Sequence, residues 1–205
     1  MIHGFDELKN LRSLPFEQYF GEMFLTKTER DLRIKLAERL EDEIWAILDI
    51  LSVLINEGVQ DVAFVSEMLY LSYIDAISSD VVVDDYIKKY VKQISDDIVN
   101  STVKYKDDIY YLSADRVRYI AENETNSVMN YQELQEALVS GKTKKTWITV
   151  KDKDVRITHV RVDEETIPIE QPFIVGGSQM MYPKDISLGA KANEIINCRC
   201  SVSYS

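Results

Sequence analysis

The chain has 205 residues, of which 45% are hydrophobic and 29% are charged, and its formal net charge is −11. A chain of this length can bury a hydrophobic core and form one or two domains, and the composition is that of a globular protein. The acidic balance argues against unaided, non-specific binding to nucleic acid, which requires clustered basic residues. No apolar stretch is long enough to cross a bilayer, and the first residues lack the order of a secretory signal. We therefore expect an intracellular protein without a membrane role.

The first third of the sequence predicts short helical turns followed by one long helix. Pro15 and Gly21 interrupt the first 25 residues, whose apolar positions suit short helical turns. Thr26 and Glu29 have the spacing of a capping box, which satisfies the free amides of a first helical turn. Apolar residues then recur every three or four positions until Gly58, a residue typical of a helix C-terminus. The apolar positions of the first segment are Phe5, Leu8, Leu11, Phe16, Phe20 and Phe24.

Three more helices are predicted before a change of pattern near Gly141. Helical spacing recurs over residues 59–77, 86–99 and 113–138, with Ser113 as the cap of the last helix. Residues 81–83 suit either a strand or a buried turn, and residues 105–112 suit a turn or an extended segment. The Lys-rich residues 141–146 are the best boundary. We therefore expect a helical region over residues 1–140 and a small β-rich domain over residues 141–205, with the 113–138 helix packed on it: an α+β fold.

Alternation of apolar and polar residues predicts strands after this boundary. We expect Trp147 and Phe173 to lie in the core of this domain, since each stands beside β-branched residues in an alternating pattern. Residues 163–165 suit a turn, and residues 187–195 suit a loop or a short helix. The expected strands cover residues 147–150, 155–162, 166–169, 173–175, 180–182 and 198–204.

The 155–162 segment also carries the candidate polar residues. On a strand, Arg156 and His159 would point to opposite faces, while Asp152, Asp154 and Arg156 would share one face. A single histidine among β-branched residues is more often structural than catalytic. Asp152, Arg156 and His159, together with Glu124 in the preceding helix, are nevertheless the candidate catalytic residues.

The two cysteines, Cys198 and Cys200, are one residue apart, which makes a disulfide framework improbable. With His159 as a third ligand they could hold zinc, although Cys-x-Cys matches zinc sites less well than Cys-x-x-Cys. Two reduced, partly buried thiols are the preferred interpretation, and a Cys–His hydrolase is a further alternative. We expect all three side chains to lie close together, because both segments are predicted strands of one small domain.

A short basic run is a candidate nucleic-acid site. The alternative is a solvated loop and strand edge, which is the more common role of so short a run. The run consists of Lys142, Lys144, Lys145, Lys151 and Lys153.

A larger set of residues carries a resemblance to a known family. The C-terminal half resembles the C-terminal domain of phage Mu F-like head morphogenesis proteins, over about residues 116–202. The predicted helix before this domain adds to the resemblance through Ile120-Ala121, Glu124-Thr125 and Asn130. The residues that carry the resemblance are Trp147, Asp152, Arg156, His159, Pro168, Phe173, Gly177, Tyr182-Pro183 and Asn197-Cys198-Arg199-Cys200.

The resemblance implies a structural minor head protein that assembles with portal, scaffold and capsid proteins. Such a protein is made in the host cytoplasm and resides inside the virion. In this interpretation the polar residues form a buried network: Glu124 with Arg156, Asp152 with backbone amides, and His159 near the cysteines. We expect no cofactor, and a bound zinc ion is the alternative. The alternative is a nuclease or toxin-like hydrolase built on Asp152, Arg156 and His159, and a DNA-binding accessory protein is a third possibility.

Overall fold

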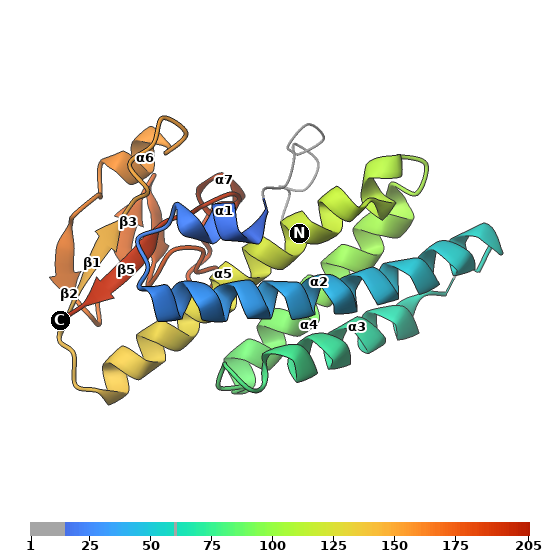
Figure 1. Ribbon diagram of the computed structural model, residues 1–205, viewed down its shortest axis with the longest axis horizontal. Coiled ribbons are helices and arrows are strands. Elements are labelled where there is room, and N and C mark those ends of the chain that lie inside the picture. The colour runs from blue at the N-terminus through green and yellow to red at the C-terminus, as the bar shows by residue number, and fades with distance from the viewer. Residues whose placement is uncertain (1–14, 60) are drawn as a thin grey trace. The chain divides into compact units, whose positions relative to one another are not determined.

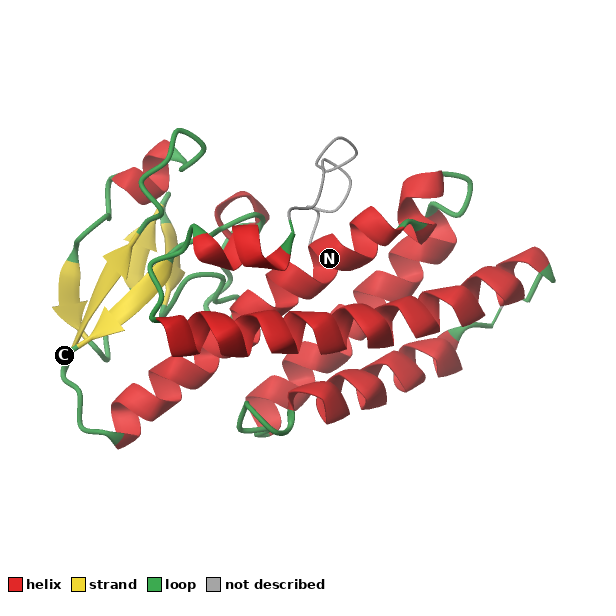
Figure 2. Cartoon of the chain, viewed as in Figure 1, coloured by secondary structure: helices red, strands yellow, loops and turns green. Residues whose placement is uncertain are grey.

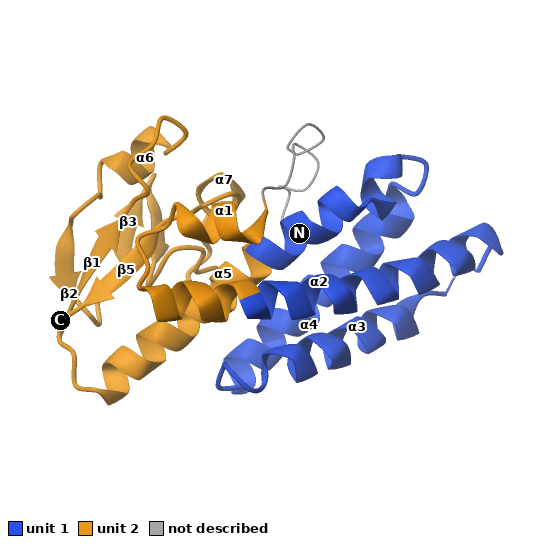
Figure 3. Cartoon of the chain, in the orientation of Figure 1, with its two compact units in different colours: residues 1–14, 35–122 blue, residues 15–34, 123–205 orange. Residues whose placement is uncertain are grey.

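The computed structural model describes residues 15–59 and 61–205 and divides into two compact units (Figure 3). Among the described residues, unit 1 holds 35–122 and unit 2 holds 15–34 and 123–205. Both unit boundaries fall inside long helices, so those two helices each contribute to both units. The division near Gly141 remains a prediction, and the predicted positions Phe5, Leu8 and Leu11 lie outside the described residues.

The long helix α2, Lys27–Asn56, begins and ends where the sequence predicts. The Thr26 amide donates to Glu29 Oε2 at 2.6 Å, and the Glu29 amide donates to Thr26 Oγ1 at 3.3 Å, which is the reciprocal capping box. Gly58, with φ of 77°, adopts the left-handed conformation that follows many helices. The stripe that α2 buries in unit 1 consists of Leu36, Leu40, Ile44, Ile47, Leu48 and Leu51.

The remaining helices of unit 1 also follow the predicted pattern (Figures 1 and 2). Helices α3 and α4 pack against each other. Asp84 caps α4 by accepting the Ile87 amide at 2.9 Å, and Ser113 caps α5 by accepting the Arg116 amide at 3.2 Å. Residues 81–83 lie outside any helix or strand, and the 105–112 segment contains one 3₁₀ turn. The elements are α3 (Ala63–Ile77), α4 (Asp85–Lys104), η2 (Ile109–Leu112) and α5 (Ala114–Val139).

Unit 2 contains two small antiparallel sheets, which confirms the α+β fold class. In the three-stranded sheet the order is β2-β1-β5, and Trp147 on β1 pairs with Val202 on β5. The two-stranded sheet is a hairpin that turns at Gly176-Gly177, both with positive φ. The strands are β1 (Lys144–Ile148), β2 (Thr166–Pro168), β3 (Phe173–Val175), β4 (Ser178–Met180) and β5 (Ser201–Tyr204). Short helices complete the unit: α1 (Phe16–Gly21), α6 (Ile157–Val160) and α7 (Ala192–Ile195).

The strand predicted over residues 155–162 is wrong. This segment is a turn followed by the four-residue helix α6, and neither sheet includes it. A short β-branched run is compatible with either state, and tertiary contacts decide between them. Here Ile157 and Val160 are 66% and 48% exposed while His159 is buried, so the burial does not follow the alternation. The prediction that Arg156 and His159 point to opposite faces of a strand is wrong for the same reason.

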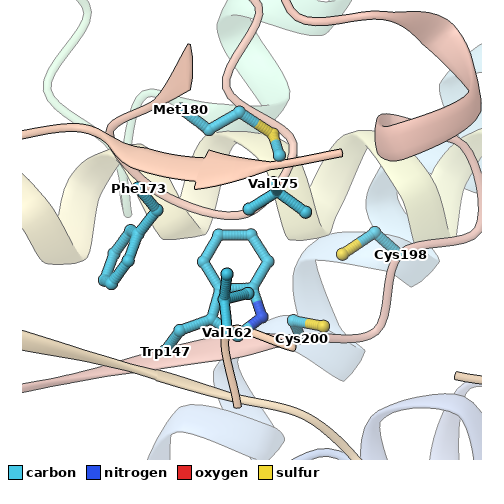
Figure 4. Close-up of a cluster of buried hydrophobic side chains, with 7 residues drawn as sticks. All are labelled: Trp147, Val162, Phe173, Val175, Met180, Cys198 and Cys200. Carbon is cyan, nitrogen blue, oxygen red and sulfur yellow. The ribbon is translucent and has the colours of Figure 1, made fainter. Parts of the chain in front are cut away.

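The core of unit 2 is built around Trp147, as predicted. Trp147 and Phe173 are 0% and 1% exposed, and their rings meet edge to face with centroids 5.2 Å apart. This geometry suits the ring quadrupoles and adds to the gain from burial. Figure 4 shows the cluster, which comprises Trp147, Val162, Phe173, Val175, Met180, Cys198 and Cys200.

A buried arginine links the start of α2 to α5 inside unit 2. Arg33 donates to Asn126 Oδ1 at 2.8 Å, to Asn130 Oδ1 at 3.0 Å and to Glu133 Oε1 at 2.6 Å. The side chain of Arg33 is fully buried and that of Glu133 is 15% exposed. Asn126 and Asn130 in turn donate to the carbonyls of Cys198 and Pro183. The network therefore ties both helices to the segment that precedes β5.

Candidate functional site

The structure brings His159 and both cysteines together in unit 2. His159 Nδ1 lies 3.4 Å from Cys200 Sγ and 3.6 Å from Cys198 Sγ. All three residues are at most 3% exposed. The predicted proximity is thus confirmed, but the predicted reason is wrong: β5 pairs with β1, and His159 reaches the thiols from helix α6.

Glu194 is a fourth member of this cluster, which the sequence did not indicate. Its Oε2 lies 3.2 Å from His159 Nε2, and both side chains are at most 3% exposed. The ring N–H is not aligned for a hydrogen bond to that oxygen. Thr158 Oγ1 donates to Oε2 at 2.7 Å and Asn193 Nδ2 donates to Oε1 at 2.9 Å, so the carboxylate is held from two sides. A lone Glu in a segment predicted as a loop or a short helix carries no recognisable signal.

Burial and mutual contact shift the acidities of this cluster in opposite directions. Burial opposes ionisation of Cys198, but hydrogen bonds from Cys200 and His159 bring the pKa of its thiol well below the usual value. The hydrogen bond to Cys198, together with burial, raises the pKa of Cys200. Burial lowers the pKa of His159, but contact with Cys198 outweighs it, so the net direction is upward.

Asp152 and Arg156 bind other parts of the chain. Asp152 accepts the Asp154 amide at 2.9 Å, as predicted, and its other oxygen lies 2.5 Å from Arg199 Nη2, but Asp152 is exposed and so does not belong to the predicted buried network. Arg156 donates to the carbonyl of Ile196. Both side chains thus position the loops on either side of the cluster. The pairing of Glu124, which is buried on α5, with Arg156 remains a prediction.

Comparison with known proteins places this site in a family. Residues 75–203, more than half of the chain, match the phage Mu protein F like family. The chain belongs to that family. The match begins well before the expected residue 116 and takes in all of α4, so the family region includes more helix than the sequence motifs indicated.

One curated protein that is similar to this chain is an enzyme. The chain is 29% identical over 92 residues to the NAD(+)–arginine ADP-ribosyltransferase EFV of Enterococcus faecalis. The similarity covers 44% of this chain and 18% of that protein, so the chain spans less than a fifth of its relative. No solved structure matches the chain at a significant level.

The candidate lysines differ in their surroundings. Lys145 is fully buried, and its Nζ donates to the Met181 carbonyl at 2.7 Å. It must therefore be removed from the candidate nucleic-acid patch, because a buried ammonium cannot reach a phosphate. Lys151 is exposed but contacts Glu164 and lies 3.7 Å from Asp163. DNA binding through exposed Lys142, Lys144 and Lys153 remains a prediction.

A surface pocket in unit 2 is not lined by Asp152, Arg156 or His159. Its volume is about 380 Å³, and Lys151 is the one member of the basic run among its lining residues. The pocket is lined by Glu22, Met23, Phe24, Thr146, Ile148, Thr149, Val150, Lys151 and Glu164.

No helix within residues 15–59 and 61–205 has an apolar stretch of the length a bilayer crossing needs.

Proposed function

We propose that this protein is a minor head protein of a tailed phage or prophage, with a structural role in assembling the capsid around its portal. The observation that carries the proposal is membership of the phage Mu protein F like family over residues 75–203. The partners are the portal protein and the scaffold and capsid proteins. The protein would reside inside the head after synthesis in the host cytoplasm, and leave with the genome in some cases.

The surroundings of the His159 cluster favour structure over catalysis. A nucleophilic thiol must reach its substrate, yet Cys198 and Cys200 are 1% and 3% exposed and belong to the buried cluster that contains Trp147. Asp152 and Arg156 bind loop groups that do not include His159. These contacts support a network that specifies the packing of unit 2. The relative's ADP-ribosyl transfer belongs to a protein of which 18% is matched, and it gives this chain no activity.

The surface for partners lies on helices α2 and α3. The long apolar stripe of α2 is buried in unit 1 and is therefore excluded as a partner surface. A second set of large apolar side chains remains exposed, and such side chains suit helix-in-groove contacts. This set consists of Trp45, Ile50 and Val53 on α2 and Phe64, Met68 and Leu71 on α3, each between 38% and 59% exposed.

Co-purification with the portal protein of the same phage or prophage tests the proposal. The chain is co-expressed with a tagged portal protein, and we expect both to elute together in size-exclusion chromatography. Trp45→Ser and Phe64→Ser should weaken the association. Ile109→Ser is the matched control, because Ile109 is 88% exposed but lies on η2. Failure of the wild-type chain to associate with portal, scaffold or capsid protein would overturn the proposal.

A second assay separates this role from the enzymatic alternative. The purified chain is incubated with DNA and with RNA, with and without added divalent ions, beside a His159→Ala variant. We expect no hydrolysis above that of the variant. Cleavage that requires His159 and Asp152 would instead identify a nuclease. Retention on DNA that weakens steeply with salt would support the accessory DNA-binding role through the exposed lysines.

A further inference from the structure

We infer that His159, Cys198 and Cys200 form a zinc site that locks the C-terminal strand of unit 2. Within the described residues, one nitrogen and two sulfur atoms of these side chains all lie within 4.8 Å of one another. The chemistry is that of a borderline-soft ion, because Zn²⁺ prefers thiolate and imidazole ligands. The inference does not depend on the head-protein role.

The two nitrogen–sulfur distances match two edges of a tetrahedral face, and the separation of the two sulfur atoms is within 4.8 Å. With Zn–S about 2.3 Å and Zn–N about 2.0–2.1 Å, two ligands at a tetrahedral angle stand roughly 3.6 Å apart. The separations of His159 Nδ1 from the two sulfur atoms are 3.4 and 3.6 Å. The ligand atoms thus stand where an ion could bind without a change of fold. Three protein ligands leave a fourth position for a water molecule, as in Cys₂His zinc sites.

The other ring nitrogen has the environment expected of a metal-bound histidine. Metal-binding histidines usually direct the second nitrogen at a carboxylate, which fixes the ring and strengthens the ligand. His159 Nε2 lies 3.2 Å from Glu194 Oε2, and Nε2 is buried without a hydrogen bond of its own in the structure. Thr158 and Asn193 hold that carboxylate in turn. Glu194 is thus the carboxylate that would position His159 in the metal-bound state, where the Nε2–H must turn into line with Oε2.

Charge and packing also favour a bound ion. Zn²⁺ with two thiolates and a neutral imidazole has no net charge, which lowers the cost of burying these three ligands, while the Glu194 carboxylate is compensated by hydrogen bonds from Thr158 and Asn193. Trp147 lies beside the two sulfur atoms (Figure 4), with its ring centroid 5.6 Å from that of His159. The ligands come from helix α6 and from the segment between α7 and β5, which are about forty residues apart in sequence. An ion would therefore crosslink β5 to the rest of unit 2.

The first test measures metal in the protein itself. The full chain, purified in a reductant without a metal-affinity step, is analysed by mass spectrometry for metal content. We expect one Zn²⁺ per chain in the wild type and in the matched control Ser203→Ala, an exposed change on β5. Cys198→Ser/Cys200→Ser should contain none. A strong chelator should lower the melting temperature of wild type but not of the double variant, and added Zn²⁺ should restore it.

The second test does not depend on whether a variant folds. Reduced, metal-free wild type is titrated with Co²⁺, and thiolate charge-transfer bands with tetrahedral d–d bands should appear and then vanish on addition of Zn²⁺. Glu194→Gln should weaken Zn²⁺ binding by roughly 10- to 100-fold in competition with a chromophoric chelator, while the bands remain. Absence of Zn²⁺ uptake by reduced wild type would overturn the inference. Binding of Cu⁺ without Zn²⁺ would overturn the assignment to zinc.

Discussion

Gly176 lies directly against the carboxylate of Glu194. A β-carbon at position 176 would stand 2.2 Å from Glu194 Oε1 and 2.5 Å from its Cδ. The glycine also has φ of +57°, in the left-handed region that other residues enter at a cost. The turn between β3 and β4 thus leaves the space in which the carboxylate next to His159 is held.

Gly176→Ala is expected to destabilise unit 2 by about 2–4 kcal/mol, from backbone strain and from displacement of a buried carboxylate. Glu194 cannot retreat freely, because it also binds Thr158 and Asn193. Gly177→Ala is the matched control: its φ is +79°, but a β-carbon there meets nothing within 4 Å. The control should cost about 1–2 kcal/mol. Equal losses in urea unfolding would contradict the role given to Gly176.

Trp147→Ala is expected to lower the free energy of unfolding by about 3–5 kcal/mol and to unfold unit 2, since it removes a fully buried ring. Phe173→Ala should have a similar effect because the two rings pack together. Near-ultraviolet circular dichroism and urea unfolding measure both effects. A stable, folded Trp147→Ala protein that had lost only partner binding would show that the ring serves recognition instead.

Arg33→Ala should cost about 3–5 kcal/mol, because it leaves the buried oxygen atoms of Asn126, Asn130 and Glu133 without their donor. Glu133→Gln should cost less, since the amide oxygen can still accept from Arg33. The double variant Arg33→Ala/Glu133→Gln should be more stable than the sum of the single losses implies. Additive losses in a denaturation cycle would argue against a coupled pair.

Lys145 should make stability depend on pH in the alkaline range. Burial lowers the pKa of Lys145 from 10.5 to about 8, against a smaller opposing effect of Asp185. Between these values the unfolded chain keeps a proton that the folded chain has lost, so the free energy of unfolding rises with pH. Relative to Lys145→Met, the wild type should gain stability as the pH rises from 8 to 10.5. A flat or falling difference in urea unfolding would contradict this assignment.

Limited proteolysis tests the predicted division of the chain near Gly141. Residues 140–144 are exposed and carry Lys142 and Lys144, so trypsin should cut first between Leu138 and Thr146. Mass spectrometry of the fragments identifies the sites. Resistance of this segment, with first cuts elsewhere, would count against a boundary there.

The local sequence pattern predicted the long helices correctly but predicted the short segment 155–162 incorrectly. The capping box at Thr26 and the cap at Ser113 form the predicted contacts, because capping depends on residues within one turn. The 155–162 segment became a turn and a helix, because four or five β-branched residues have no decisive preference of their own. The resemblance of the C-terminal motifs to the family is confirmed, but the match extends further into the helices than those motifs do.

The sequence alone determined the α+β class, the long amphipathic helices and the aromatic core of unit 2, since each depends on periodicity or alternation, and its motifs carried the resemblance to phage head proteins. Only the tertiary structure placed Glu194 behind His159, buried Lys145 and left Gly176 against a carboxylate. Those relationships join segments up to about 40 residues apart through side chains that have no periodic signature. Their positions follow from which groups find partners once the chain is packed, because an unpartnered buried polar group costs more free energy than any local preference supplies.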